Sequence, residues 1–312
     1  MTELLQTTLD GLLNGGSYAL VGLGLTLTFG MLRRLNLAYG AGAMLAAYVG
    51  AWLHLQHAAP WGVVLIAVVG VAALVGLYVE WLCFAAPGHR GATSRAALPG
   101  GADGREVVAL AASFALWMQL EQLAVNLLPR HLNPFPSLAV AGEWALGPLV
   151  LRPDRAALLA LAVLLTLGLA AWLRHTRGGL AWRAASDQPT AAHLMGIAVP
   201  RVQRAAFVTA CALSGMAACA VLALEGQVTP MFGMWVLIKG LVAAMLGGMG
   251  SVRGVLVGGI VLGVTEAHAQ AAFGALGREF ATYALLFAVL VLPLPRWAAA
   301  LAPAAVVGAH GR

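Results

Sequence analysis

Four glutamates of this chain lie within or beside long apolar stretches: Glu80, Glu121, Glu225 and Glu266. An ionised carboxylate in hydrocarbon costs several kcal/mol, so each of them needs water or a polar partner. Glu80, Glu225 and Glu266 lie near the ends of their stretches, where we expect them to reach water. Glu121 lies within its stretch, and its neighbours at helical spacing are also polar: Gln119, Gln122 and Asn126. Glu121 therefore faces either an aqueous path or a polar seam between helices.

Enzyme and metal chemistry have little support in the sequence. His54 and His57 form a lone HxxH pattern, but neither an HExxH motif nor a pair of carboxylates accompanies it. The phosphate-binding patterns GxxxxGKS and GxxxxGKT are absent, so any ATP hydrolysis must occur on separate subunits. Cys83, Cys211 and Cys219 lie in apolar runs and are expected to be core residues. We assign no catalytic residue, no metal site and no cofactor, and expect that the chain is not an enzyme.

The composition is that of an integral membrane protein. Hydrophobic residues make up 61% of the 312 residues and charged residues 10%, with a mean hydropathy of +0.86. Ordinary soluble domains have roughly 25% charged residues. We expect one all-α domain, residues 1–312, that forms a helical bundle in lipid with about eight or nine transmembrane segments. The net charge of +6 does not indicate a nucleic-acid partner, because the arginines are scattered between apolar segments.

Nine apolar segments indicate the membrane spans. They cover roughly residues 12–32, 36–53, 61–84, 107–128, 156–173, 205–224, 236–249, 255–267 and 281–293. The last three are short or interrupted by glycine, so we expect broken or re-entrant helices near residues 236–267. The segment at 236–249 is either half a span or part of a broken helix.

The arginines indicate the orientation in the membrane. If the Arg33–Arg34 turn is inside, 13 arginines fall inside and four fall outside. The four outside are Arg130, Arg152, Arg155 and Arg278. Because cytoplasmic loops carry the excess of basic residues, we expect the amino terminus outside and the carboxyl terminus inside.

The glycine-rich stretch GGMGSVRGVLVGG begins at Gly247, and three of its glycines recur every four residues. Such spacing leaves one helix face nearly bare, which favours either close helix packing or a tight re-entrant turn. Arg253 interrupts the stretch and is best placed at the inner surface, in a turn between two helical segments. The residues assigned to packing or turning are Gly247, Gly248, Gly250 and Gly254.

The first apolar segment and the start of the second carry polar side chains, among them Asn14, Tyr18, Asn36 and Tyr39. Buried polar groups in lipid need partners. Interhelical hydrogen bonding is one explanation of these residues, and a translocation pathway that also includes Glu121 is the other.

The arginine-dense segment at residues 174–204 separates two apolar stretches and holds five arginines against one acid, Asp187. Such a segment is typical of a loop on the inner face of a membrane. Asp187 is suited to cap a short helix, Pro189 to occupy its first turn and Gly196 to end it. This helix, backed by Arg183, is either a docking element for a soluble partner or an ordinary amphipathic loop.

The whole chain resembles the shorter, LivH-like permease subunit of the branched-chain amino acid class of ATP-driven importers. Three sets of residues carry the resemblance. The first comprises Asn14-Gly15, Tyr18-Ala19-Leu20, Gly24-Leu25, Phe29-Gly30, Arg33 and Asn36-Leu37-Ala38-Tyr39-Gly40. The second comprises Thr176, Gly179, Ala181, Arg183-Ala184, Ala191-Ala192 and Gly196-Ile197. The third comprises Lys239, Leu246-Gly247-Gly248-Met249-Gly250-Ser251 and Gly254.

The resemblance implies a multi-pass permease of the bacterial plasma (inner) membrane that translocates a small polar solute. It implies four partners: two cytosolic ATP-binding subunits, a second homologous permease and an extracytoplasmic solute-binding protein. The residues that it assigns to ATPase coupling are Arg183, Asp187, Ala191, Ala192 and Gly196. The expected solute is a branched-chain or other amino acid. A urea or amide permease of the same importer class and an ion-coupled secondary carrier are the alternatives.

The chain departs from the family pattern at four positions. Leu180 stands where arginine is usual, and Thr190 stands where glutamate is common. Tyr39 replaces a common histidine, and Ala41 replaces an acid. The first two departures are expected to weaken or re-tune ATPase docking, and the other two to accompany a different substrate.

Overall fold

The computed structural model describes residues 2–32, 36–85, 104–127, 133–137, 144–146 and 149–291 of the chain. Seven of the arginines on which the expected orientation depends lie outside the described residues: Arg33, Arg34, Arg90, Arg95, Arg130, Arg296 and Arg312.

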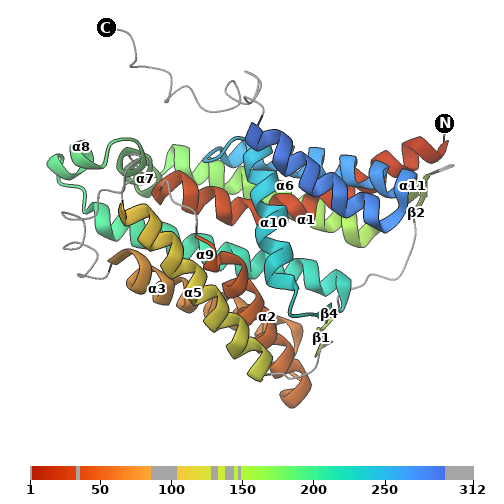
Figure 1. The fold of residues 1–312 in the computed structure, drawn as a ribbon, viewed down its shortest axis with the longest axis horizontal. Coiled ribbons are helices and arrows are strands. Elements are labelled where there is room, and N and C mark those ends of the chain that lie inside the picture. The colour runs from red at the N-terminus through yellow and green to blue at the C-terminus, as the bar shows by residue number, and fades with distance from the viewer. Residues whose placement is uncertain are drawn as a thin grey trace, which may run out of the picture.

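The described part of the chain folds into a bundle of long helices (Figure 1). They are α1 Thr2–Leu32, α2 Ala38–His57, α3 Trp61–Val79, α5 Gly104–Leu127, α6 Pro153–His175, α9 Val199–Glu225, α10 Phe232–Leu246 and α11 Val252–Val291. A π-helical turn, η1 (Glu80–Ala85), continues α3, and two short helices, α7 (Arg177–Asp187) and α8 (Pro189–Leu194), follow α6. Among the described residues, six helices are long and apolar enough to cross a membrane: α1, α3 with its π-turn, α5, α6, α9 and α11. The protein is therefore a multi-pass helical bundle.

Two short antiparallel strand pairs lie in the connections between helices, and the all-α prediction did not include them. β1 (Asn133–Pro134) pairs with β4 (Gln227–Val228), and β2 (Trp144–Leu146) pairs with β3 (Leu149–Leu151). Backbone groups in these connections have no helical partner, so they pair with one another instead. The pairs do not change the helical class of the fold.

Helix α1 is the centre of the bundle, because it packs against α6, α9, α10 and α11. Its glycines make this packing close. A methyl group on Gly15 would lie 2.7 Å from the Ile260 Cα atom of α11, and one on Gly16 would lie 2.7 Å from the Leu159 Cα atom of α6. Such backbone contact stabilises helix association in lipid, where no hydrophobic driving force acts between helices.

Helix α10 crosses the direction of α1 and ends at Leu246, and the chain turns back into α11 over residues 247–251 (Figure 1). Gly248 and Gly250 have φ angles of +85° and +90°, in the left-handed region that favours glycine. Gly247 and Gly254 face each other so closely that a methyl group on either would overlap the carbonyl group of the other. The glycine-rich stretch therefore makes both a tight turn and a close helix contact.

Helix α11 reverses at Gly274 and forms two antiparallel halves. Gly274 has φ +72° and ψ −162°, which interrupts the helix. A methyl group on Gly277 would lie 2.6 Å from the Ala269 carbonyl oxygen, because the second half folds back on the first. The two halves contain the apolar segment expected at residues 255–267 and the described residues, 281–291, of the one expected at 281–293.

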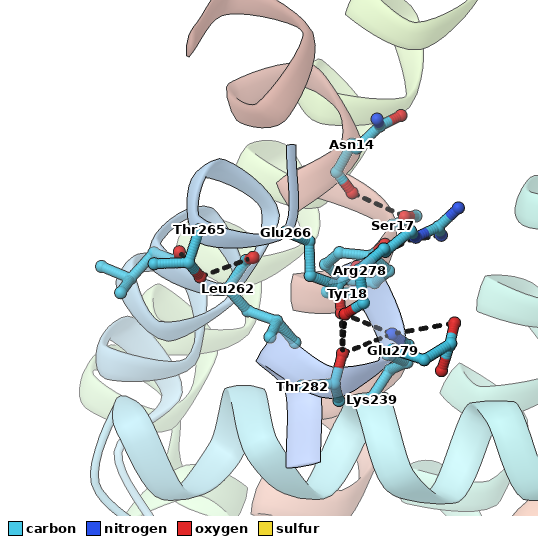
Figure 2. A network of polar contacts seen from close by, with 11 residues as sticks. Asn14, Ser17, Tyr18, Lys239, Leu262, Thr265, Glu266, Arg278, Glu279 and Thr282 are labelled. Atoms are coloured by element: carbon cyan, nitrogen blue, oxygen red, sulfur yellow. Dashed lines mark hydrogen bonds and ion pairs between the residues drawn. The ribbon is translucent and has the colours of Figure 1, made fainter. Parts of the chain in front are cut away.

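A buried ion pair joins α10 to both halves of α11 (Figure 2). Lys239 of α10 donates to Glu266 in the first half of α11, and their side chains are only 2% and 3% exposed. The Thr282 hydroxyl in the second half accepts from Lys239 at 2.6 Å and donates to Glu266. The expectation that Glu266 reaches water is wrong, because the returning half of α11 and α10 cover it.

Removing one member of this pair should destabilise the protein more than removing both. Lys239→Met leaves the Glu266 carboxylate buried without its nearest cation, so we expect the free energy of unfolding to fall by about 3 kcal/mol. The double variant Lys239→Met, Glu266→Gln leaves neither charge of the pair and should recover part of that loss. Unfolding of the purified variants in detergent measures both quantities. Additive losses would contradict this expectation.

Gly254→Ala should destabilise the contact between α10 and α11, because the added methyl group would overlap the Gly247 carbonyl. Gly70→Ala in α3 is the matched control, since no atom lies within 4 Å of its added methyl group. Alanine also favours a helix over glycine by about 1 kcal/mol. Thermal unfolding in detergent should therefore show a lower midpoint for Gly254→Ala and an unchanged or higher midpoint for Gly70→Ala. Equal midpoints would show that the helix contact does not limit stability.

Candidate functional site

A cavity of about 740 Å³ lies beside the N-terminal half of α1. Asn14, Ser17 and Tyr18 of α1 line it, together with Trp235 of α10 and Arg278 of α11. Ligand pockets for small molecules have volumes of roughly 300–1,000 Å³, so the space is large enough for a small solute. Asn14 and Tyr18, which the sequence assigned to a possible pathway, therefore share one cavity.

Charges of both signs line this cavity. The cationic residues are Arg152, Arg155 and Arg278, and the anionic residues are Asp10, Asp154 and Glu225. The lining also includes apolar side chains, among them Leu158, Val221, Leu224 and Trp235. A lining of this kind can hold a solute that carries a positive charge, a negative charge and an apolar part.

Tyr18 connects the cavity to the buried ion pair (Figure 2). Its hydroxyl donates to Glu266 at 2.5 Å and accepts from a terminal nitrogen of Arg278 at 2.9 Å. The Arg278 Nε also donates to Glu266, at 3.2 Å. The Tyr18 ring centroid lies 5.8 Å from that of Trp235 and 5.7 Å from the Lys239 ammonium group. Residues of α10 and of both halves of α11 therefore hold this wall of the cavity.

A second cavity, of only about 10 Å³, lies near the start of α2. Asn36 and Tyr39 line it together with Cys211 and Ser214 of α9. The Tyr39 hydroxyl donates to the Val21 carbonyl of α1 at 2.8 Å. The buried amide nitrogen of Asn36 has no hydrogen-bond partner in the described part of the chain. A volume of this size holds about one water molecule. The bundle is therefore wide at the first cavity, of about 740 Å³, and narrow at the second.

Glu121 lies apart from both cavities. It belongs to α5, which packs against α2 and η1. Its carboxylate accepts a hydrogen bond from the Trp117 indole, one turn earlier on the same helix, at 2.7 Å. The structure brings Asn14 together with Tyr18 and Asn36 together with Tyr39, but it brings Glu121 to neither pair. Periodicity along one helix did not show this, because it does not reveal which neighbour a polar face meets.

The arginine-dense segment folds into two short helices, α7 and α8. Thr176 caps α7, since its hydroxyl accepts a hydrogen bond from the Gly179 N–H at 3.0 Å. Asp187 does not cap α8, as the sequence suggested. It is the last residue of α7 and keeps a helical backbone, whereas a capping residue must leave the helical conformation. Gln188 precedes α8 instead, without a side-chain hydrogen bond, and Pro189 occupies its first turn as expected.

Gly196 terminates α8, as the sequence predicted. The Gly196 N–H donates to the His193 carbonyl at 3.0 Å, and the Ile197 N–H donates to the Ala192 carbonyl at 3.1 Å. This pair of bonds is the Schellman motif, which requires a left-handed residue after the helix. Gly196 supplies it with a φ angle of +83°.

Helices α7 and α8 lie at the end of the bundle opposite the amino terminus (Figure 1). On their inner faces Trp182, Ala185 and Ala192 belong to one apolar cluster with Leu27 of α1 and Val199 of α9. Through this cluster the α7–α8 segment packs against α1 and α9.

The outer faces of α7 and α8 are exposed. Of the five residues assigned to ATPase coupling, four are exposed, namely Arg183, Asp187, Ala191 and Gly196, and Ala192 is buried. Leu194 and Met195 are each 83% exposed, and Leu180 is 58% exposed. The segment therefore presents apolar side chains as well as charges.

The described cysteine and histidine side chains form no further cluster. Cys83, Cys211 and Cys219 are buried and free, which confirms them as core residues. The ring centroids of His57 and Trp52 are 5.3 Å apart, at the end of α2. Within the described ranges, no group of three His, Cys, Asp or Glu residues could hold a metal ion.

Several residues of the first cavity or its support were not predicted from the sequence, among them Lys239, Arg278, Trp235 and Glu225. Lys239 is the only lysine of the chain, and it lies within an apolar stretch. That position indicates a buried partner of opposite charge. Hydropathy alone did not identify the partner, because Glu266 lies 27 residues later in another helix.

Residues 7–294 match the family of the branched-chain amino acid transport system permease component. The chain is 26% identical over 303 residues to the high-affinity branched-chain amino acid transport system permease protein LivH of Salmonella typhimurium. It is also 26% identical over 291 residues to the permease protein BraD of Pseudomonas aeruginosa. Each alignment covers 92% of this chain and 93% of the relative. A solved structure, PsaBC from Streptococcus pneumoniae in complex with Fab, is 12% identical with a TM-score of 0.47, over 92% of this chain and 91% of that one.

The family match spans the helices that line the cavity, the α7–α8 segment and the glycine turn. The multi-pass helical architecture agrees with a membrane-embedded transport component. The chain therefore belongs to the family of branched-chain amino acid transport system permease components, as a multi-pass inner-membrane permease subunit whose ATP hydrolysis resides on partner subunits.

Proposed function

We propose that this permease serves an ATP-binding cassette importer for zwitterionic amino acids with apolar side chains, such as the branched-chain amino acids. The cavity beside α1 is the observation that carries this proposal, because cationic, anionic and apolar side chains line one space. The names of its relatives, which refer to branched-chain amino acid transport, support the same class of solute.

Partner subunits supply the energy and deliver the solute. The sequence lacks a phosphate-binding motif of its own. We infer two cytosolic ATP-binding subunits, a second homologous permease and an extracytoplasmic binding protein. The cavity lies toward the amino-terminal end of α1, which the arginine distribution places outside. The binding protein would release its solute there, while the ATPases would dock at the opposite end on α7 and α8.

The solute path would lead from the wide cavity beside α1 to the narrow one between α2, α3 and α9. Asn14 and Tyr18 line the first, and Asn36 and Tyr39 line the second. A bundle that is wide at its outer end and narrow further in is accessible from outside. Transport then requires a second arrangement, in which the space around Asn36 and Tyr39 widens and the outer cavity closes.

The α7–α8 segment would transmit motion from the ATPases to this path. Its buried face contacts Leu27 on α1, the helix that also carries Asn14 and Tyr18. A displacement of α8 would therefore move α1 through packed side chains.

Two of the four departures from the family pattern lie on the exposed side of the segment. Leu180 and Thr190 replace charged residues there, and both are exposed. Docking would therefore depend more on apolar contact, to which the neighbouring Leu194 and Met195 contribute. Association of this kind is less sensitive to salt than an ion pair at the same position.

Two alternatives differ from the proposal in solute or energy source. A urea or amide permease would bind a neutral solute, which has no use for cavity charges of both signs. An ion-coupled carrier would need unpaired charged residues beside broken helices. On both sides of the break in α11, Glu266, Arg278 and Glu279 belong to ion pairs instead, with Lys239 or with each other.

Uptake into vesicles tests the proposed function. Vesicles that contain this permease with its ATPases, sister permease and binding protein should accumulate leucine only when ATP is present. Vesicles without the ATPases are the control. Leucine uptake driven by an ion gradient in the control vesicles would contradict the proposal, and so would ATP-driven uptake of urea in place of leucine.

Gly196→Ala should weaken coupling to the ATPases. A side chain at a φ angle of +83° strains the end of α8 by about 1 kcal/mol, although nothing lies within 4 Å of the added methyl group. Gly226→Ala is the matched control, because Gly226 has φ +71° and equally open surroundings but terminates α9. We expect Gly196→Ala to reduce the amount of ATPase that co-purifies at least twofold, and Gly226→Ala to leave it unchanged. Equal amounts with both variants would show that α8 is not the docking element.

A further inference from the structure

One cation of the α1 cavity is held in place by buried partners. Arg278 donates through Nε to Glu266 at 3.2 Å and through a terminal nitrogen to the Tyr18 hydroxyl at 2.9 Å. The side chains of Arg152 and Arg155 have no ion pair or hydrogen bond to any other described residue. Arg278 is therefore the one oriented guanidinium group among the three that line the cavity.

The guanidinium group of Arg278 still has donors for a solute. A guanidinium carries five N–H groups, and Glu266 and Tyr18 accept from two of them. The side chain is 37% exposed and lines the cavity, so the group is accessible from it. Because the orientation of this guanidinium is already fixed, the arginine side chain loses less conformational freedom on binding a carboxylate than a mobile arginine would.

Arg278 is the charged member of this polar network that lines the cavity. Lys239 is the nearest cation to Glu266, and both are almost fully buried. Lys239 also lies 3.7 Å from Glu279. The network of Lys239, Arg278, Glu266 and Glu279 is therefore neutral in sum, but Arg278 is the only one of the four that lines the cavity, so a solute there meets a positive charge.

Glu225 offers the opposite charge in the same cavity. It is the last residue of α9 and has no ion-pair partner among the described residues. It lines the same cavity as Arg278. Val221 and Leu224 of α9 and Trp235 of α10 supply apolar surface in the same lining. A carboxylate, an ammonium group and an apolar side chain on one solute would each find a partner.

We propose that Arg278 binds the carboxylate of the transported amino acid and Glu225 its ammonium group. This assignment rests on the proposed function, because it takes the α1 cavity as the solute site. Tyr18 and Glu266 are then positioning residues, because they accept hydrogen bonds from the guanidinium group and so fix its orientation. The Lys239–Glu266 pair stabilises that arrangement without touching the solute.

Solute binding to the purified full-length permease in detergent tests the assignment. Binding is measured as the rise in unfolding temperature with L-leucine, with L-leucinamide, which lacks the carboxylate, and with urea. The native protein should bind leucine at least about tenfold more tightly than leucinamide, and urea should not stabilise it. Arg278→Gln should lose that tenfold preference, and Arg278→Lys, which keeps the charge beside Glu266, should retain part of it.

Arg204→Gln is the matched control, because Arg204 also donates through Nε to a glutamate, Glu80, at 3.0 Å, but on the α7–α8 side of the bundle. It should retain the full preference for leucine. The same loss in Arg152→Gln as in Arg278→Gln would overturn the assignment to Arg278. Equal binding of leucine and leucinamide by the native protein would overturn carboxylate recognition.

The binding measurement uses neither ATP nor partner subunits, which separates it from the proposed function. A reconstituted transporter that failed to import leucine with ATP would refute the proposed function, whatever the preference measured in detergent. A transporter that imported leucine with ATP, and did so equally well with Arg278→Gln at low leucine concentration, would refute the role of Arg278 alone.

Discussion

The buried contact between Lys239 and Glu266 is the interaction on which the arrangement of the central helices depends. Neither charge can remain alone among apolar helices, because an unpaired buried ion is strongly destabilising. The pair requires α10 to lie beside the first half of α11. The remaining hydrogen-bonding capacity of the carboxylate brings in Thr282 from the second half and Tyr18 from α1. The hydrogen bonds and ion pairs of the Glu266 carboxylate therefore determine how one wall of the large cavity is arranged.

Glycines and the ion pair have complementary effects in this bundle. Gly15 and Gly16 let α11 and α6 approach α1 closely, but close contact alone would allow helices to slide past one another. The polar network permits one register only, because its partners must meet at hydrogen-bonding distance. Helix α1 connects the two ends of the bundle, because Tyr18 lines the cavity at one end and Leu27 packs in the α7–α8 cluster at the other.

The sequence predicted what depends on local pattern and did not predict what depends on contacts between distant helices. Apolar segments, the glycine turn and the stop at Gly196 follow from composition and backbone preference, and the structure contains them. Glu266 was judged by its distance from the end of a segment, whereas α10 and the returning half of α11 decide its surroundings. Glu121 is the opposite case, because it is surrounded by polar residues in sequence yet bonds to Trp117 of its own helix.

The reversal at Gly274 also bears on how the chain enters a membrane. Glu266, Arg278 and Thr282 all belong to the single hairpin that this reversal creates. The carboxylate can therefore meet a cation and a hydroxyl within its own hairpin, before that hairpin contacts α10 or α1. A segment whose charge is compensated internally is less costly to transfer into lipid than one that carries an isolated ion. The reversal at Gly274 thus lowers the free-energy cost of inserting the buried Glu266 into the membrane.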